Sequence, residues 1–262
     1  MSETIKILFL AANPAEMDPL QLGRESRAID LALRATSFRD RFSLEDHWAV
    51  QPGDLQELLL RHEPQIVHFS GHGVESNSIL LVDDNGQAYP VGAALLGELF
   101  GHFAESVRCV VLNACYSDEQ ARQIAQHIDC VIGIADLLAD EDAIAFSAAF
   151  YRSLGYGKSM QIALDLARNE VALGNRPVTF LPDMIALRTD PASLVLVQPV
   201  ADALLGEGMS PAPQPVPLAD IDEGHPALEK MAAGTPRLMW LIIGLLGLGL
   251  LGLVSLPLLL GP

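Results

Sequence analysis

Apolar and polar positions alternate along residues 1–198 in two periods, one typical of buried strands and one typical of amphipathic helices. The short apolar runs predict strands at 5–10, 43–50, 66–69, 79–82, 87–91, 107–112 and 130–134. Apolar residues spaced three or four positions apart predict helices over 22–33, 54–62, 93–103, 118–128, 144–154 and 160–173. Strands that alternate with helices of this length predict an α/β domain whose mostly parallel sheet is covered on both faces.

One connection departs from this alternation. Asp83-Asp84-Asn85-Gly86 separates the strands predicted at 79–82 and 87–91, and Asn-Gly is a strong hairpin signal. We therefore expect an antiparallel hairpin inside the otherwise parallel domain. Reactive side chains are expected beyond the carboxyl ends of the parallel strands.

The pattern changes after residue 198. Residues 199–236 are rich in proline, alanine, glycine and acidic residues, which predicts an extended linker. Residues 237–261 then form one apolar segment, in which Leu238–Leu260 carries no charge over 23 residues. At a rise of about 1.5 Å per residue this length crosses a bilayer core of about 30 Å. A buried core helix is the alternative, but no polar face interrupts the run. The sequence therefore predicts a single transmembrane helix.

The few charges near this segment predict its orientation. Lys230 and Arg237 precede it and no charge follows it, which places the N-terminal domain in the cytoplasm. Trp240 lies near its start, where interfacial aromatic residues are enriched. The lipid bilayer is thus one predicted partner, and the predicted localisation is the membrane, with a single pass.

Charge and cysteine content narrow the functional classes. The chain has 33 acidic and 16 basic residues, a formal net charge of −17, which argues against nucleic-acid binding. Its three cysteines, Cys109, Cys115 and Cys130, are odd in number and no secretory signal precedes them. We therefore expect a reducing compartment and no disulfide framework.

Two predicted strands run directly into reactive residues. The first is Ile66-Val-His-Phe-Ser-Gly-His-Gly73 and the second is Val110-Val-Leu-Asn-Ala-Cys-Tyr-Ser117. If the strands are parallel neighbours, His72 and Cys115 emerge at the same edge of the sheet. A cysteine attacks as the thiolate, which a nearby imidazole favours, and the imidazole later protonates the leaving amine.

The backbone around the two residues fits the same chemistry. Ser117 and Gln120 form a capping-box pattern, so the positive end of the following helix is expected near Cys115. The N–H groups of Gly73 and Cys115 are the predicted oxyanion hole. Cys109 and Cys130 are predicted to be buried apolar residues, and His68 to be structural. No cluster has metal-ligand spacing, so no metal or cofactor is predicted.

These motifs resemble those of the caspase-like peptidases, most closely the CHAT family, which is related to separase. The similarity covers residues 5–180 and includes Ile7-Leu-Phe-Leu-Ala-Ala-Asn-Pro14 and Val131-Ile-Gly-Ile-Ala-Asp136. It implies a caspase-like three-layer sandwich, a catalytic dyad of His72 and Cys115, and hydrolysis of peptide bonds without metal. It also implies a role in bacterial defence or cell-death pathways.

Several relatives of the caspases are similar in preferring a basic residue before the cleaved bond, held by an acidic pocket. Asp136 follows the strand predicted at 130–134 and is the predicted specificity residue, although acidic loops are more often simply solvated. The sequence thus favours a membrane-anchored cysteine endopeptidase acting on a protein or peptide substrate, with self-association at the membrane. A catalytically silent scaffold that recruits partners and a small-molecule-binding signalling module are the alternatives.

Overall fold

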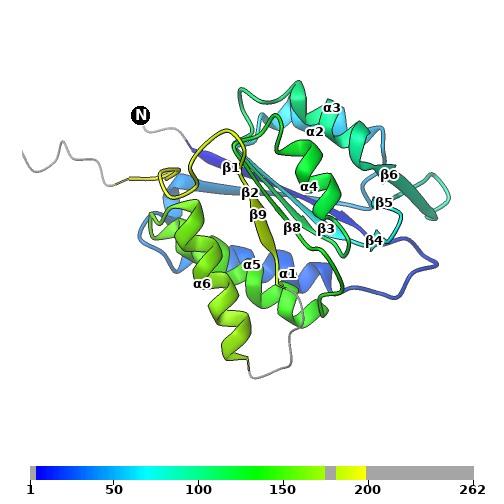
Figure 1. The fold of residues 1–262 in the computed structure, drawn as a ribbon. Helices are drawn as coiled ribbons and strands as arrows, with labels where there is room; N and C mark the ends of the chain where they lie inside the picture. The colour runs from blue at the N-terminus through cyan, green and yellow to red at the C-terminus, as the bar shows by residue number, and fades with distance from the viewer. Residues whose placement is uncertain (1–3, 175–180, 199–262) are drawn as a thin grey trace, which may run out of the picture. The chain divides into compact units, whose positions relative to one another are not determined.

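A six-stranded sheet is the centre of the computed structural model, which describes residues 4–174 and 181–198 (Figure 1). The strand order is β2-β1-β3-β7-β8-β9, parallel throughout except that β9 runs antiparallel to β8. The strands are β1 (Ile5–Ala12), β2 (Phe42–Trp48), β3 (Ile66–Gly71), β7 (Cys109–Asn113), β8 (Cys130–Gly133) and β9 (Asp183–Ile185). The predicted mostly parallel sheet is confirmed.

Helices cover both faces of this sheet. On one face lie α1 (Leu22–Arg34), α5 (Asp140–Gly155) and α6 (Met160–Leu173) (Figure 1). On the other lie α2 (Asp54–His62), α3 (Ala93–Gly101) and α4 (Asp118–Ile124). A short 3-10 turn, Arg39–Arg41, leads into β2. The described residues therefore form the three layers expected of an α/β domain with a doubly covered sheet.

Two hydrophobic cores explain why the central strands carry apolar residues on both faces. Ile7 and Phe9 of β1 pack in the core under α1, α5 and α6, while Leu8 and Leu10 pack in the core under α2, α3 and α4. All six residues of β3 are buried. A strand that buries both of its faces loses the alternation of apolar and polar residues that a half-exposed strand shows.

The predicted hairpin is confirmed as part of a second, three-stranded antiparallel sheet, β4-β5-β6. Its strands are β4 (Gly73–Val74), β5 (Ser78–Val82) and β6 (Ala88–Gly92). The turn is closed by hydrogen bonds from Asp83 N–H to the Gln87 carbonyl at 2.8 Å and from Gly86 N–H to the Asp83 carbonyl at 3.0 Å. Gly86 has a φ of 79°, a conformation that glycine adopts without strain. This small sheet begins at Gly73, so that His72 is the one residue between β3 and β4.

Some elements differ from the sequence prediction. Helix α4 ends at Ile124 rather than at residue 128, and the chain reaches β8 through tight turns. The strands β4 and β9 have two and three residues, too few for a periodic pattern, and were not predicted. Strand β9 forms through backbone pairing with β8, a contact between distant segments that a local sequence pattern does not show.

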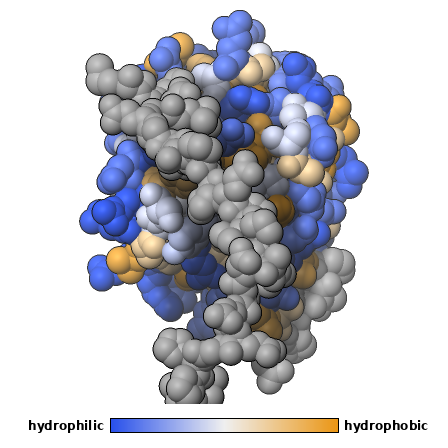
Figure 2. Space-filling model, turned by 90° about the vertical axis from the view of Figure 1, so that its left-hand side faces the viewer, coloured by the Kyte–Doolittle hydropathy of each residue, from blue (hydrophilic) through white to orange (hydrophobic). Residues whose placement is uncertain are grey.

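The predicted linker at 199–236 and the transmembrane helix at 237–261 lie outside the described residues. Within the described residues, no helix is both long enough and apolar enough to cross a membrane. On the face that Figure 2 shows, hydrophilic side chains predominate and hydrophobic ones form small separate groups. This pattern is ordinary for a folded domain surface.

Candidate active site

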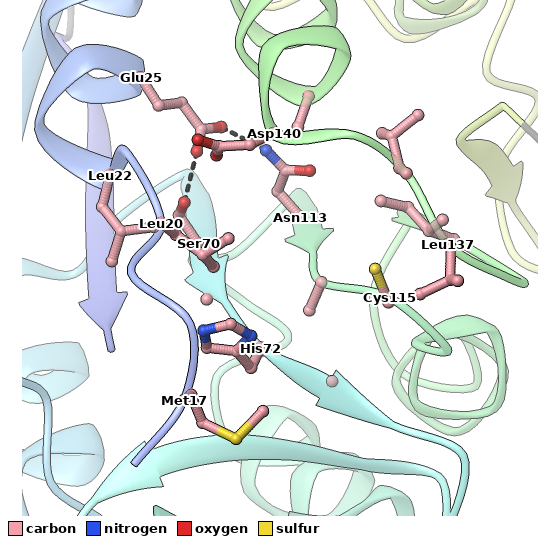
Figure 3. Close-up of a pocket in the computed structure, with 16 residues that line it drawn as sticks. Met17, Leu20, Leu22, Glu25, Ser70, His72, Asn113, Cys115, Leu137 and Asp140 are labelled. Carbon is pink, nitrogen blue, oxygen red and sulfur yellow. Dashed lines mark hydrogen bonds between the residues drawn. The ribbon is translucent and has the colours of Figure 1, made fainter. Parts of the chain in front are cut away.

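A pocket of about 210 Å³ lies beyond the carboxyl ends of β3 and β7, where the sequence predicts reactive residues (Figure 3). His72 and Cys115 both line it, His72 directly after β3 and Cys115 two residues after β7. The two strands are parallel neighbours in register from Ile66↔Cys109 to Ser70↔Asn113. The structure therefore brings the two predicted catalytic residues to one pocket from segments 43 positions apart.

Cys115 lies in a sharp turn between β7 and α4. The next residue, Tyr116, has a φ of 54°, in the left-handed region that non-glycine residues rarely occupy. The turn is held by hydrogen bonds from Ser117 N–H to the Ile134 carbonyl at 2.7 Å and from Ile134 N–H to Ser117 Oγ at 3.0 Å. Because β8 fixes the turn from the other side, the thiol is displayed at the pocket rather than packed in the core.

The predicted capping box is wrong. Ser117 makes no side-chain cap to α4, and its hydroxyl instead donates to the Leu112 carbonyl at 3.2 Å. The Gln120 side chain is buried with no hydrogen-bond partner among the described residues. The hydroxyl is used to fasten the Cys115 turn to β7 and β8, so it is unavailable to the helix.

His72 is oriented by the segment that follows β1. Its Nε2 lies 3.0 Å from the Asp18 carbonyl oxygen and 3.1 Å from Asn13 Oδ1. Both neighbours are acceptors, so Nε2 carries the hydrogen and Nδ1 is left to exchange a proton. Among the described residues, no hydrogen bond joins His72 to Cys115.

The surroundings of His72 favour a neutral imidazole. Burial lowers the pKa of His72, and the hydrogen bond to the Asp18 backbone and the charges of Asp18 and Asp140 only partly offset this effect. At neutral pH the ring is therefore a base that can accept a proton, as proton transfer from a thiol requires.

Gly73 packs against the backbone of Cys115. A Cβ added to Gly73 would lie 1.8 Å from the Cys115 carbonyl oxygen, so only glycine permits this approach. Leu80 N–H donates to the His72 carbonyl at 2.9 Å, which makes the adjacent pair Gly73 and Ile79 a non-hydrogen-bonded pair of the β4–β5 ladder. The N–H of Gly73 consequently points away from β5. That N–H is therefore not used in the β4–β5 ladder, and its role in an oxyanion hole stays a prediction.

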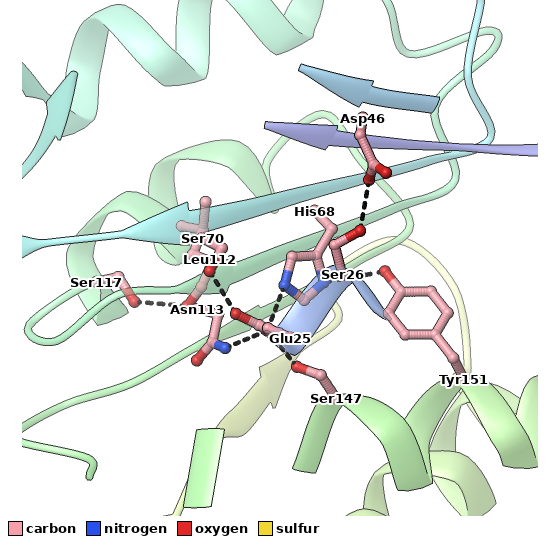
Figure 4. Close-up of polar contacts among 10 residues, drawn as sticks. All are labelled: Glu25, Ser26, Asp46, His68, Ser70, Leu112, Asn113, Ser117, Ser147 and Tyr151. Atoms are coloured by element: carbon pink, nitrogen blue, oxygen red, sulfur yellow. Dashed lines mark hydrogen bonds and ion pairs between the residues drawn. The ribbon is translucent and has the colours of Figure 1, made fainter. Parts of the chain in front are cut away.

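A buried carboxylate connects the strands behind the pocket (Figure 4). Glu25, on α1, is 2 % exposed. It accepts hydrogen bonds from His68 Nε2 at 3.0 Å, Ser147 Oγ at 2.6 Å, Ser70 Oγ and Asn113 Nδ2. His68 is in turn 3.1 Å from the Tyr151 hydroxyl. The network therefore joins α1, β3, β7 and α5.

This network reaches the candidate dyad through its strands. Ser70 precedes His72 by two residues and Asn113 precedes Cys115 by two, so one carboxylate holds both strand ends. Burial alone would raise the pKa of Glu25, but the neighbouring His68 and the hydrogen bonds from Ser147 and Ser70 outweigh it and hold the pKa below its usual value. Glu25 is therefore an anion at neutral pH.

Asp136, the predicted specificity residue, is not among the residues that line the pocket. Its carboxylate accepts a hydrogen bond from Leu137 N–H at 2.7 Å. Partial desolvation, followed by the charges of Asp136 and Glu75, raises the pKa of Tyr116. Asp136 thus lies beside Tyr116, next to Cys115 in the chain, and its role in specificity stays a prediction.

Among the described residues, no group of three or more His, Cys, Asp or Glu is placed to hold a metal ion.

Comparison with known proteins finds similarity to proteases. The chain is 27 % identical over 168 residues to a Roc-COR-CHAT protease of an unknown prokaryotic organism, covering 62 % of this chain and 16 % of that protein. It is 23 % identical over 173 residues to a probable protease of Gillisia limnaea, covering 64 % of this chain and 31 % of that protein. The chain therefore matches less than a third of the length of either relative. No family model matches.

Solved structures of similar arrangement include two cysteine proteases. A secreted C11 cysteine protease from Bacteroides thetaiotaomicron, in complex with an irreversible peptide inhibitor, matches with a TM-score of 0.49 at 11 % identity, covering 66 % of this chain and 60 % of that one. Caspase-1 from Spodoptera frugiperda matches with a TM-score of 0.49 at 10 % identity, covering 70 % and 86 %.

The sequence analysis missed Glu25, although a signal was present. Leu22, Glu25, Ser26, Ile29 and Leu33 are the buried residues of α1, and their spacing of three and four positions is that of a core-facing stripe. A carboxylate within such a stripe must have buried partners. The acceptor role of the Asp18 carbonyl has no comparable signal, because it belongs to the backbone.

Replacement of Glu25 by glutamine is expected to change how stability depends on pH. A carboxylate whose pKa is lower in the folded state stabilises the fold above its ordinary pKa of 4.5, and this contribution is lost as the pH falls through the folded value. The free energy of unfolding, measured by urea denaturation between pH 3 and 7, should therefore fall less steeply toward acid in Glu25→Gln than in the wild type. The control is Glu57→Gln, because Glu57 is an exposed carboxylate paired with Arg61, and this variant should keep the wild-type slope. Equal slopes in the wild type and both variants would contradict the role assigned to Glu25.

Proposed function

We propose that residues 4–198 form a cysteine endopeptidase domain in which Cys115 is the nucleophile and His72 carries the proton. The observation that carries this proposal is the shared pocket, which places a thiol on a fixed turn and an imidazole whose Nε2 is held by the Asp18 carbonyl. Sequence similarity to two proteins named as proteases supports it independently of the geometry.

The proposed reaction is acyl transfer. The sulfur of Cys115 attacks the carbonyl carbon of the scissile peptide bond while Nδ1 of His72 accepts the thiol proton. The negative oxygen that develops is stabilised by the N–H groups of Gly73 and Cys115. His72 then gives the proton to the leaving amine, and a thioester with Cys115 remains. Water, deprotonated by His72, hydrolyses the thioester and regenerates the thiol.

The membrane-anchored form of this enzyme is a separate proposal, supported by the sequence alone. Leu238–Leu260 has the length and apolarity of a single transmembrane helix, and the charges before it favour a cytoplasmic domain. Confinement to a membrane raises the effective concentration of membrane-bound substrates and of sister copies. An effector or processing role in bacterial defence or cell death rests on the family resemblance.

Cleavage of a peptide library should depend on Cys115 and His72 but not on the other cysteines. Cys115→Ala is expected to abolish cleavage, and His72→Ala to reduce the rate by about 10²-fold to 10⁴-fold, the usual contribution of general acid–base catalysis. Cys109→Ala is the matched control, since Cys109 is fully buried in the core on the opposite end of β7. Cleavage that survives in Cys115→Ala would contradict the proposal. If the wild type cleaves no peptide of the library but still binds partner proteins, the alternative of a catalytically silent scaffold is favoured.

Membrane attachment is tested by fractionation of cells that express the full chain or residues 1–198. The full chain is expected in the membrane fraction, resistant to extraction by high salt and by alkaline carbonate, whereas residues 1–198 should remain in the supernatant. Release of the full chain by carbonate would rule out a spanning helix.

A further inference from the structure

Asn13 is the first residue after β1, and His72 is the first residue after β3. The two strands pair in register as far as Ala12↔Gly71, so Asn13 and His72 are the next residues along them. A Cβ added to Gly71 would lie 2.6 Å from the Ala12 carbonyl oxygen, so glycine at this position lets the strand ends approach closely. The sheet register therefore brings the Asn13 side chain within reach of the imidazole.

The backbone of Asn13 is restricted by the proline that follows it. A residue before proline is disfavoured in the helical region and prefers an extended backbone. Pro14 is buried, and its carbonyl accepts a hydrogen bond from Met17 N–H at 3.1 Å, which turns the chain back toward His72. Asn13 thus stands at a defined point, where the chain leaves the sheet and enters the segment 13–20.

The orientation of the Asn13 amide follows from the donors that face it. His72 Nε2 lies 3.0 Å from the Asp18 carbonyl oxygen, which can only accept, so Nε2 carries a hydrogen. Leu20 N–H is also a donor, and it and His72 Nε2 face the same atom, Asn13 Oδ1, at 3.4 Å and 3.1 Å. The amide therefore presents its oxygen to the ring rather than its NH₂ group.

One side chain thereby controls both acceptors of His72. Asp18 lies inside the segment 13–20, whose ends are joined by the hydrogen bond from Leu20 N–H to Asn13 Oδ1. Asn13 thus contacts the ring directly and also closes the loop that carries the Asp18 carbonyl. In Figure 3 His72 lies between this segment and Cys115. With Nε2 held by the segment, Nδ1 is available to receive a proton.

Asparagine orients the imidazole without adding charge to it. The amide is neutral, so it leaves the preference of His72 for the uncharged ring in place, whereas a carboxylate at the same point would favour the protonated ring. Once His72 has accepted the thiol proton, the same oxygen faces an imidazolium N–H, and a charged donor makes the stronger hydrogen bond. The contact therefore strengthens as the proton moves, which is the condition for lowering a barrier.

We propose that Asn13 is a positioning residue of the candidate active site, whose side-chain oxygen fixes the ring of His72 with Nδ1 available to the thiol of Cys115. Asn13 acts through His72 rather than on the substrate. The inference rests on the proposed function in one respect, that His72 exchanges a proton with Cys115.

The titration of His72 tests the contact without a substrate. The imidazole signals of His72 are followed against pH by NMR in the Cys115→Ala protein. Asn13→Asp keeps the acceptor and adds a negative charge, so it should raise the pKa of His72. Asn169→Asp adds the same charge at an exposed position of α6, outside the pocket lining, and should leave the titration where it is. A His72 titration that is identical with and without Asn13→Asp would overturn the inference.

The rate at which iodoacetamide alkylates Cys115 tests the positioning role. Asn13→Ala should slow this reaction about tenfold near neutral pH, the effect of losing one hydrogen bond to a group that becomes charged. Asn169→Ala is the matched control and should keep the wild-type rate. Asn13→Asp should keep the wild-type rate at alkaline pH, and on acidification its rate should fall at a higher pH than that of the wild type.

A double variant separates positioning from a general effect on the fold. In the His72→Ala protein the ring is missing, so Asn13→Ala should have no further effect on the alkylation rate. An equal slowing by Asn13→Ala with and without His72 would overturn the inference, as would rates in Asn13→Asp and Asn13→Ala that are equal at every pH.

Failure of this inference and failure of the proposed function give different results. If Asn13→Asp shifts the His72 titration and Asn13→Ala slows alkylation, but no peptide is cleaved, the positioning role stands and the peptidase proposal fails. If peptides are cleaved and Asn13→Ala cleaves them at the wild-type rate, the positioning role is wrong and the peptidase proposal stands.

Discussion

The buried carboxylate of Glu25 is the interaction on which the geometry of the pocket depends. A carboxylate removed from water is costly unless its oxygens accept hydrogen bonds, and Glu25 receives them from β3, β7 and α5. These donors are therefore constrained to converge on one point beneath the sheet edge. Because Ser70 and Asn113 are each two residues before a member of the candidate dyad, the same constraint sets the spacing of His72 and Cys115.

The remaining parts of the pocket follow from strand order. Placing β3 between β1 and β7 puts the segment after β1 beside His72, where the Asp18 carbonyl holds Nε2. It also lets Gly73 pack against the Cys115 backbone as the chain leaves β3 for the small antiparallel sheet. The result is a pocket whose lining holds a neutral imidazole, a displayed thiol and the ionised carboxylate of Glu25.

The sequence predicted well the features that depend on residues close together in the chain. His72 and Cys115 follow apolar strands, and Asn85-Gly86 encodes its own turn, so local patterns sufficed. The capping box failed because the Ser117 hydroxyl donates to the Leu112 carbonyl of β7 and accepts from the N–H of Ile134, just after β8, instead of capping α4. Glu25 was missed because its partners lie 43 or more positions away, and the Asp18 carbonyl because any residue has one. The buried stripe of α1 indicates that Glu25 faces the core, but the local sequence identifies neither its distant hydrogen-bond partners nor a backbone acceptor.

The central claim is that His72 acts on the thiol of Cys115, and the pH dependence of cysteine alkylation tests it without a substrate. Cys109 and Cys130 are fully buried, so iodoacetamide applied to residues 1–198 reports on Cys115. The account predicts that Cys115 is alkylated faster near neutral pH in the wild type than in His72→Ala, because the neutral imidazole accepts the thiol proton. Superimposable rate–pH curves for wild type and His72→Ala would contradict it.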